Sequence, residues 1–270
     1  MVDATFSGAS YAVATDHHRA HDVDVLAPVR WRAGMRVLDL GCGVGDFTVR
    51  VADLVLSGEV FGVDASASQV EHARAAASRP GLRFEVARAQ ELDLLVPAGW
   101  ADVVLSVAVL HWLVEGDQPV VWRQVARALA PEGMVRLDMG GAGQIEDTRA
   151  ELDEVAAAAY GVSGSPWVFP DEASVCGLLV GAGSRPLHVQ LLRQRRGMPD
   201  EAALEGWLRS HVLALSAVPT RPGTRWCARR SRPRRCAGAR RACAARTARS
   251  TSTTCAWTPR QLTSERRAGW

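Results

Sequence analysis

Short apolar runs alternate with helical segments along most of the chain. Parallel strands that are buried on both faces read as nearly continuous apolar runs, and such runs occur at residues 37–40, 59–64, 82–87, 101–108 and 134–139. Segments with a helical spacing of apolar residues lie at 46–56, 66–77 and 119–129. Strands and helices that alternate in this way predict an α/β fold with a doubly wound, Rossmann-like sheet.

The same pattern divides the chain into four parts. After the core it predicts lid helices at 145–160 and 170–183, a sixth strand at 187–195 and a further helix at Trp207 and Leu208. The expected parts are an N-terminal cap helix within 1–35, ended by Pro28; the core at 36–142; the lid helices and sixth strand at 143–218; and a basic low-complexity tail at 219–270.

Composition narrows the class of protein. A chain of 270 residues with 47% hydrophobic composition can bury one sizeable core. Because it has no run of about 18 apolar residues and no signal-peptide pattern, we expect a cytoplasmic protein without membrane contact. We also expect a monomer. The six cysteines lack the paired spacing of zinc sites. His17, His18 and His21 could suggest a metal site, but without a carboxylate face beside them a solvated surface is favoured, and no metal is predicted.

The first strand runs into a glycine-rich turn, and Val37 to Asp46 reads V-L-D-L-G-C-G-V-G-D. The glycines allow a tight turn and a close backbone approach to a ligand, and the helix that follows presents unpaired N–H groups to negative charge. Asp39 interrupts an otherwise apolar strand, and a charged side chain at such a position indicates a functional role. This stretch therefore predicts a ligand site.

Two classes of ligand suit such a turn. The dinucleotide fingerprint G-x-G-x-x-G holds a pyrophosphate, but here the third glycine comes one residue early and Asp39 would repel the phosphates. A ligand with a carboxylate, an ammonium and a ribose fits better, because Asp39 would attract the ammonium and Asp64, at the end of the second strand, would hold the ribose. S-adenosylmethionine has these groups. A nicotinamide dehydrogenase is the alternative enzyme.

Residues 6 to about 215 resemble the class I S-adenosylmethionine-dependent methyltransferases. The resemblance is carried by V-L-D-L-G-C-G-V-G as the cofactor loop, by V-F-G-V-D as the ribose-binding segment, and by L-A-P-E-G-M before the fifth strand. Within that superfamily, S-V-A-V-L-H-W-L, W-V-F-P-D-E-A-S-V-C-G-L-L-V-G-A-G and M-P-D-E-A-A-L-E-G-W-L-R-S are similar to the trans-aconitate methyltransferase group. The implied activity is methyl transfer from S-adenosylmethionine to a small molecule, in this group O-methylation of a carboxylic acid.

The resemblance also implies roles for single residues. Asp39 and the backbone of Gly41 and Gly43 would hold the methionine end, Asp64 the ribose, and Ala65 would lie against the adenine. The expected cofactor-binding residues are Asp39, Gly41, Cys42, Gly43, Gly45, Asp64, Ala65, Ala89, Gln90, Ser106 and Val107. Where the family commonly has an acid that reads the adenine amino group, this chain has Arg88 or Ala89, and the usual P-G-G turn is Pro131-Glu132-Gly133.

The methyl acceptor would lie beyond the fourth strand. His111 is the candidate general base for a hydroxyl, amine or carbon acceptor, with packing beside Trp112 as the alternative, and Trp112 could flank a ligand or belong to the core. A carboxylate acceptor is already ionised and needs cations rather than a base. The candidate acceptor-binding residues are Tyr11, Arg193, Arg195, Arg196 and Arg209, with a solvated surface as the alternative for the arginines.

The tail differs in composition from the rest of the chain. From Arg221 onward it carries 14 arginines and one acid, a net charge of +13, whereas residues 1–220 carry 18 arginines and 28 acids, a net charge of −10. Without an apolar period we expect it to be disordered, so that the last strand of the sheet is missing or replaced. A nucleic-acid-binding arm, which would make the protein a non-catalytic binder, is the functional alternative.

A shifted reading frame is a further hypothesis for the tail. Codons permitted for Arg246–Thr258 can be chosen so that another frame encodes D-G-T-F-D-V-D-Y-V-R-L-D, an alternating strand that resembles the terminal strand of the trans-aconitate group.

Overall fold

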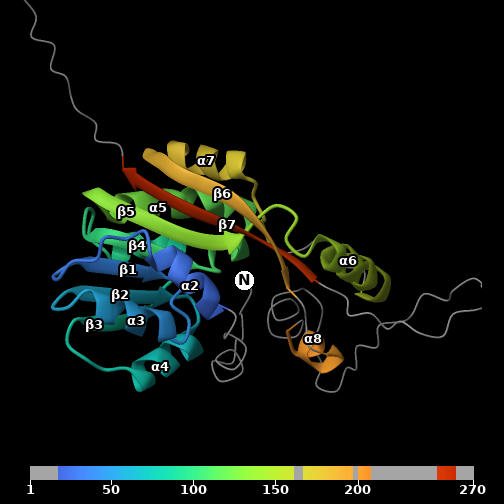
Figure 1. Ribbon diagram of the computed structural model, residues 1–270, viewed down its shortest axis with the longest axis horizontal. Helices are drawn as coiled ribbons and strands as arrows, with labels where there is room; N and C mark the ends of the chain where they lie inside the picture. The colour runs from blue at the N-terminus through green and yellow to red at the C-terminus, as the bar shows by residue number, and fades with distance from the viewer. Residues whose placement is uncertain (1–17, 161–166, 197–199, 208–247, 260–270) are drawn as a thin grey trace, which may run out of the picture.

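A mixed seven-stranded sheet forms the centre of the computed structural model, which describes residues 18–160, 167–196, 200–207 and 248–259 (Figure 1). The strand order is β3-β2-β1-β4-β5-β7-β6, and β1 to β5 pair in parallel. The doubly wound α/β fold expected from the sequence is confirmed. The strands are β1 (Arg36–Leu40), β2 (Glu59–Asp64), β3 (Leu82–Val86), β4 (Ala101–Val107), β5 (Leu129–Gly140), β6 (Ser184–Arg196) and β7 (Ala248–Pro259).

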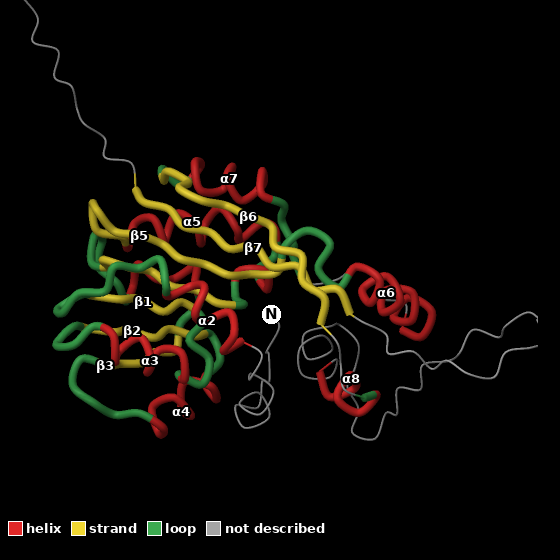
Figure 2. The backbone as a smooth tube through the Cα atoms, in the orientation of Figure 1, coloured by secondary structure: helices red, strands yellow, loops and turns green. Residues whose placement is uncertain are grey.

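Helices cover both faces of the sheet (Figures 1 and 2). One face carries α5 (Gln118–Ala128) and α7 (Glu172–Gly181), and the other carries α2 (His18–Leu26), α3 (Asp46–Leu54) and α4 (Ala67–Ala76). Beyond the carboxyl ends of the parallel strands lie α6 (Glu146–Tyr160) and α8 (Glu201–Trp207). The short 3-10 helices are η1 (Ala89–Leu94), η2 (Leu110–Trp112) and η3 (Glu115–Asp117). No helix in the described ranges is long and apolar enough to cross a bilayer.

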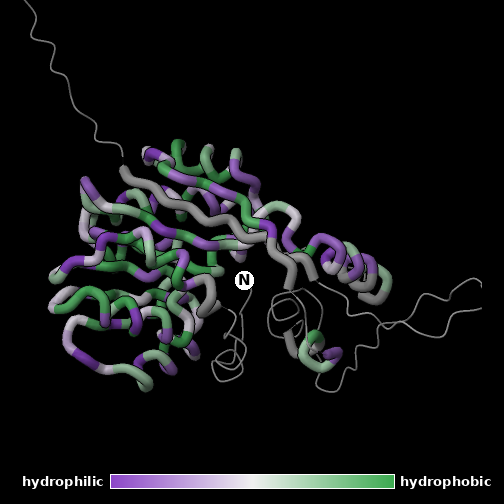
Figure 3. Tube along the Cα trace, viewed as in Figure 1, coloured by the Kyte–Doolittle hydropathy of each residue, from purple (hydrophilic) through white to green (hydrophobic). Residues whose placement is uncertain are grey.

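The hydrophobic runs fill both interfaces because successive side chains of a strand point to opposite faces. Leu38 and Leu40 of β1 belong to the buried cluster with Trp122 of α5, whereas Val37 belongs to the cluster with Val51 of α3. Figure 3 shows the apolar residues gathered along the central strands and the polar ones toward the outside. Because both faces of the parallel strands are buried in these cores, the strands have nearly continuous apolar sequences and could be predicted.

A buried arginine attaches α2 to the sheet. The Arg136 guanidinium, on β5, donates to the carbonyl oxygens of Val25 (3.3 Å) and Asp24 (3.0 Å) near the end of α2. The last carbonyls of a helix have no partner within the helix, so the buried cation satisfies them and stabilises the negative end of the helix dipole.

Two strands extend beyond their expected bounds. β5 begins at Leu129, which pairs with Ala101, and the register shifts before Val103 pairs with Met134. Residues 130–133, expected as a turn ahead of the strand, therefore form an irregularity within it. β6 begins at Ser184 rather than at residue 187, because β7 pairs along its whole length.

The expectation that the last strand is missing or replaced is wrong, because residues 248–259 of the tail form β7. This strand lies between β5 and β6 and is antiparallel to both, with Ser252 opposite Gly140 on one side and Leu192 on the other. Its backbone groups pair with two long neighbours, and this tertiary pairing outweighs a sequence that lacks the usual alternation. The other tail residues lie outside the described ranges.

Candidate cofactor and acceptor site

The glycine turn is fixed against the ends of two neighbouring strands. Gly41, Gly43 and Gly45 have φ values of 79°, 55° and 86°, which favour glycine over residues with a side chain. The N–H groups of Gly41 and Cys42 both donate to the carbonyl oxygen of Val63, at 2.7 and 3.1 Å. A Cβ atom at Gly41 would lie 2.1 Å from a methyl group of Val109. The backbone is thus held where only glycine fits.

Asp64 lies between this turn and the start of α4. Its Oδ2 accepts a hydrogen bond from the Gly43 N–H (2.9 Å) and its Oδ1 accepts one from the Ser66 N–H (2.8 Å). Burial raises the pKa of this carboxyl group, and the two N–H donors oppose the shift. Each carboxylate oxygen has a further lone pair, so both can accept a hydrogen bond from a ligand hydroxyl.

Asp39 is a buried acid at the end of β1, with 2% of its surface exposed. Its Oδ2 accepts a hydrogen bond from the Thr48 hydroxyl of α3 at 2.6 Å. Burial raises the pKa of Asp39 to about 7; the Thr48 hydrogen bond opposes this shift, and the charge of Asp64 adds to it. The two acids are therefore close enough for their charges to interact, and a bound cation would relieve their repulsion.

These residues fit S-adenosylmethionine. Asp39 offers a buried carboxylate to an ammonium, Asp64 offers two acceptors to a ribose, and Gly41 and Gly43 add no side chain to the turn. The two acids that the sequence predicted as partners in one site lie together at the carboxyl edge of β1 and β2.

Replacement of Asp39 by asparagine should remove part of the pH dependence of stability in the absence of ligand. Because the folded pKa of about 7 lies above the ordinary aspartate pKa of 3.8, ionising this carboxyl weakens the folded state as the pH rises from about 4 to 7. At about 1.4 kcal/mol per pKa unit, Asp39→Asn should gain up to a few kcal/mol over wild type between pH 5 and pH 8.

Urea unfolding at several pH values measures this difference. Asp46→Asn, at the exposed start of α3, is the control and should change the pH dependence less than Asp39→Asn does. Parallel curves for wild type and Asp39→Asn would contradict the expectation.

A carboxylate lies beside Gln90, one of the residues expected to bind the cofactor, although it comes from a distant element. The Gln90 side-chain amide donates to Oδ2 of Asp117, on η3, at 2.6 Å, and the Arg88 guanidinium lies 3.8 Å from the same oxygen. Ala65, directly after β2, is exposed, and Ala89, at the start of η1, is buried. The sequence analysis missed Asp117 because 27 residues separate it from Gln90 and only the fold brings them together.

Three further residues lie on the elements around the glycine turn, two of them at the end of β4 and one on α4. The Ser106 hydroxyl donates to the Leu40 carbonyl oxygen (2.9 Å), which ties β4 to the end of β1, and Val107 packs against the α2 and α3 cluster. Gln69 of α4 is 5% exposed, and its Oε1 has no hydrogen-bond partner in the described part of the chain. The sequence analysis missed Gln69, although a glutamine beside Val70 on the buried side of a helix was a detectable signal.

The expected acceptor side contains an aromatic cluster. The ring of Trp112 lies 5.2 Å from that of His111 and 5.6 Å from that of Trp167, and Phe169 lies 5.7 Å from His111. The Trp112 indole N–H donates to the Ala108 carbonyl oxygen at 3.0 Å. Trp112 is thus packed and hydrogen-bonded at the carboxyl end of β4.

The geometry of His111 conflicts with its expected role as a general base. Its Nδ1 accepts a hydrogen bond from the Gly140 N–H at 3.0 Å, so the ring proton belongs on Nε2. Burial lowers the pKa of His111 to about 3. A neutral ring whose acceptor nitrogen is occupied can donate a hydrogen bond from Nε2, but it has no free lone pair with which to take a proton.

Two arginines are described at the same edge of the sheet. Arg193 is exposed at the carboxyl end of β6, and its Nη1 is 3.9 Å from the place of a Cβ atom on Gly143. Arg149 of α6, which the sequence analysis missed, has its guanidinium carbon 5.3 Å from the centre of the Phe169 ring. Tyr11 and Arg209 lie outside the described residues, and the side chains of Arg195 and Arg196 are likewise not described.

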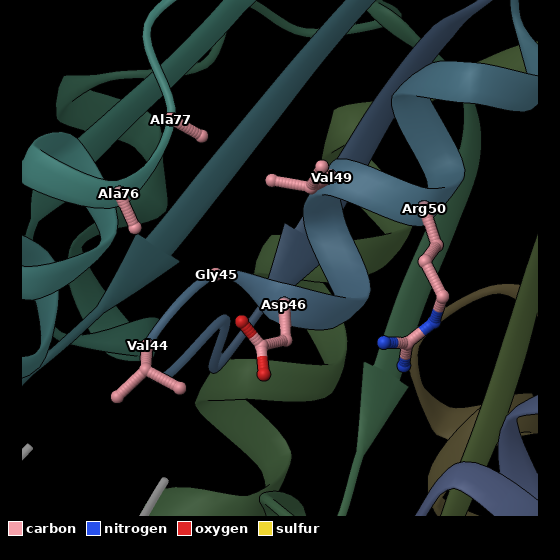
Figure 4. Close-up of a pocket in the computed structure, with 7 residues that line it drawn as sticks. All are labelled: Val44, Gly45, Asp46, Val49, Arg50, Ala76 and Ala77. Carbon is pink, nitrogen blue, oxygen red and sulfur yellow. The ribbon is translucent and has the colours of Figure 1, made fainter. Parts of the chain in front are cut away.

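A hollow of about 310 Å³ lies on the outer side of the glycine turn, between α3 and the end of α4 (Figure 4). Val49 points across it toward Ala76 and Ala77, whereas the Arg50 side chain extends away and pairs with Asp22 of α2. Of the expected cofactor-binding residues only Gly45 lines this hollow, and neither Asp39 nor Asp64 does.

Comparison with known proteins gives concordant matches. Residues 37–133 match the family model described as a methyltransferase domain. The chain is 30% identical over 227 residues to the trans-aconitate 2-methyltransferase of Methylobacterium radiotolerans, covering 81% of this chain and 84% of that one. Its counterpart from Deinococcus radiodurans is 35% identical over 120 residues, covering 44% of this chain and 43% of that one.

Among solved structures, the geranyl diphosphate C-methyltransferase of Streptomyces coelicolor, in complex with S-adenosyl-L-homocysteine, has a TM-score of 0.55 at 12% identity. The match covers 90% of this chain and 79% of that one. At that identity the likeness concerns the fold.

Proposed function

The chain belongs to the class I S-adenosylmethionine-dependent methyltransferases, in the trans-aconitate methyltransferase group, and on this basis we propose that it O-methylates a small carboxylic acid. S-adenosylmethionine supplies an electrophilic methyl group, so the protein chiefly has to align the acceptor in a closed site. This family membership rules out the alternative hypothesis from the sequence analysis, a nicotinamide dehydrogenase.

The observation that carries the proposal is the hydrogen bond from the Gly140 N–H to His111 Nδ1. It occupies the lone pair that a hydroxyl, amine or carbon acceptor would need from this histidine. A carboxylate has no proton to lose at neutral pH, and the Nε2–H of His111 is suited to donate to one of its oxygens. The histidine would then orient the acceptor rather than deprotonate it.

The positions of Arg149 and Arg193 support the same acceptor class. Arg193 extends from the end of β6 beside Gly143, and Arg149 lies over Phe169, which is itself next to His111. A guanidinium presents a planar set of donors that matches a carboxylate, and a compact acid with several carboxylates could engage more than one cation.

The test is a panel of acceptors incubated with isotopically labelled S-adenosylmethionine and the purified protein. The expected product is a methyl ester, formed from di- or tricarboxylic acids and hydrolysed by mild alkali with release of labelled methanol. A product that resists alkali, with the methyl group on nitrogen, carbon or an ether oxygen, would overturn the proposal.

Arg193→Gln should raise the KM for the acid about tenfold or more, the loss expected for one charge-assisted hydrogen bond, while S-adenosylhomocysteine binds as before. Arg185→Gln is the matched control, because Arg185 is exposed near the opposite end of β6. Equal effects of the two substitutions would show that Arg193 acts only through overall charge.

A further inference from the structure

We propose that Gln69 is an additional cofactor-binding residue, whose carboxamide hydrogen-bonds a ribose hydroxyl of S-adenosylmethionine together with Asp64. The inference rests on the use of this cofactor and not on the identity of the acceptor. It assigns a function to a buried polar group that the fold itself leaves unsatisfied.

The burial of Gln69 is the first part of the argument. On α4 it lies beside Val70 and Ala73 on the buried side of the helix, and only 5% of its surface is exposed. Its Oε1 has no hydrogen-bond partner within the described residues. A buried amide oxygen without a partner weakens the folded state, whereas methionine of nearly the same shape would fill the space without that cost. A partner from outside the chain explains the amide.

The position of Gln69 indicates which partner. Its Oε1 lies 3.1 Å from the place where a Cβ atom on Gly43 would stand, so the absence of a side chain at Gly43 keeps space open for the carboxamide. The N–H of Gly43 donates to Asp64 Oδ2. Gln69 and Asp64 therefore flank the same residue of the glycine turn, which places the orphan acceptor beside the acid that would hold the ribose.

The chemistry of the two side chains is complementary. A ribose hydroxyl both donates and accepts hydrogen bonds, whereas an ionised carboxylate only accepts them. A carboxamide can do either, so it can accept a second hydroxyl proton through Oε1 or donate to a hydroxyl oxygen through Nε2. Asp64 and Gln69 together offer more complete hydrogen bonding to the two ribose hydroxyls than the acid alone.

The experiment measures binding of S-adenosylhomocysteine and of its 2′-deoxy and 3′-deoxy analogues by isothermal titration calorimetry, without an acceptor. Gln69→Met should bind S-adenosylhomocysteine about tenfold more weakly, the effect of one hydrogen bond, and should discriminate less than wild type against one of the two deoxy analogues. The ligand-free variant should melt at the same temperature as wild type or higher, because an unsatisfied buried group has been removed. Gln190→Met, on the exposed part of β6, is the matched control and should bind all three ligands as wild type does.

Three results would overturn the proposal. These are unchanged affinity for S-adenosylhomocysteine, undiminished discrimination against both deoxy analogues, and a lower melting temperature of the ligand-free variant. Undiminished discrimination together with weaker binding would assign Gln69 to the adenine amino group or the ammonium instead. Because no acceptor is present, none of these results depends on whether the acceptor is a carboxylic acid.

Discussion

A chain that ends at residue 247 should fail to unfold cooperatively, whereas a chain that ends at Pro259 should keep the cooperative transition of the full-length protein. The shorter chain lacks β7, which pairs with β6 from Ser184 to Arg196 and with β5 from Val135 to Gly140. Its removal exposes two facing rows of backbone groups inside the sheet. At roughly 0.5–1.5 kcal/mol per lost hydrogen bond, the loss approaches the 5–15 kcal/mol by which a typical domain is stable.

Urea and thermal unfolding followed by circular dichroism measure the effect, and size-exclusion chromatography reports aggregation through the open strand edges. The chain ending at Pro259 controls for removal of residues 260–270. A sharp transition of the shorter chain, with the midpoint of the longer one, would mean that β7 does not contribute to the stability of the sheet.

The second large effect is expected for Asp64→Asn, which should weaken S-adenosylhomocysteine binding about 100-fold or more. The change retains the size of the side chain but removes the negative charge to which the two ribose hydroxyls would donate hydrogen bonds. A hydrogen bond to a charged group contributes about 1.5–3 kcal/mol. It also turns an amide donor toward one of the N–H groups of Gly43 and Ser66, which now donate to the carboxylate.

Isothermal titration calorimetry with S-adenosylhomocysteine measures the affinity. Asp102→Asn is a close control, because Asp102 also accepts a backbone N–H, that of Arg36 (2.8 Å), but at the opposite edge of the sheet. Asp102→Asn should keep the wild-type affinity. Equal losses for the two variants would point to general destabilisation rather than to ribose binding.

The parts of the site that could be predicted from sequence are those built from local chemistry. Asp39 in an apolar strand, the glycines after it and Asp64 at the end of the next strand are each specified within a few residues, and parallel pairing of β1 with β2 brings them together. Once β1 and β2 are known to be neighbouring parallel strands, the proximity of these residues follows.

The parts that could not be predicted depend on contacts between distant elements. Gly140 of β5 determines the tautomer of His111, and Asp117 of η3 reaches Gln90 only through the packing of α5 on η1. β7 was missed for the same reason, since its place is determined by two neighbouring strands rather than by its own alternation. Local periodicity contains no information about such partners.

The position of β7 also determines when the central sheet can form fully during translation. Translation proceeds from the N-terminus, so β5 and β6 emerge first, and residues 197–247 must follow before Ala248 can begin the strand that belongs between them. Pairings across such long separations in sequence close slowly. Nascent chains would therefore expose the unpaired edges of β5 and β6 until residues 248–259 have been translated, and exposed strand edges of this kind favour aggregation.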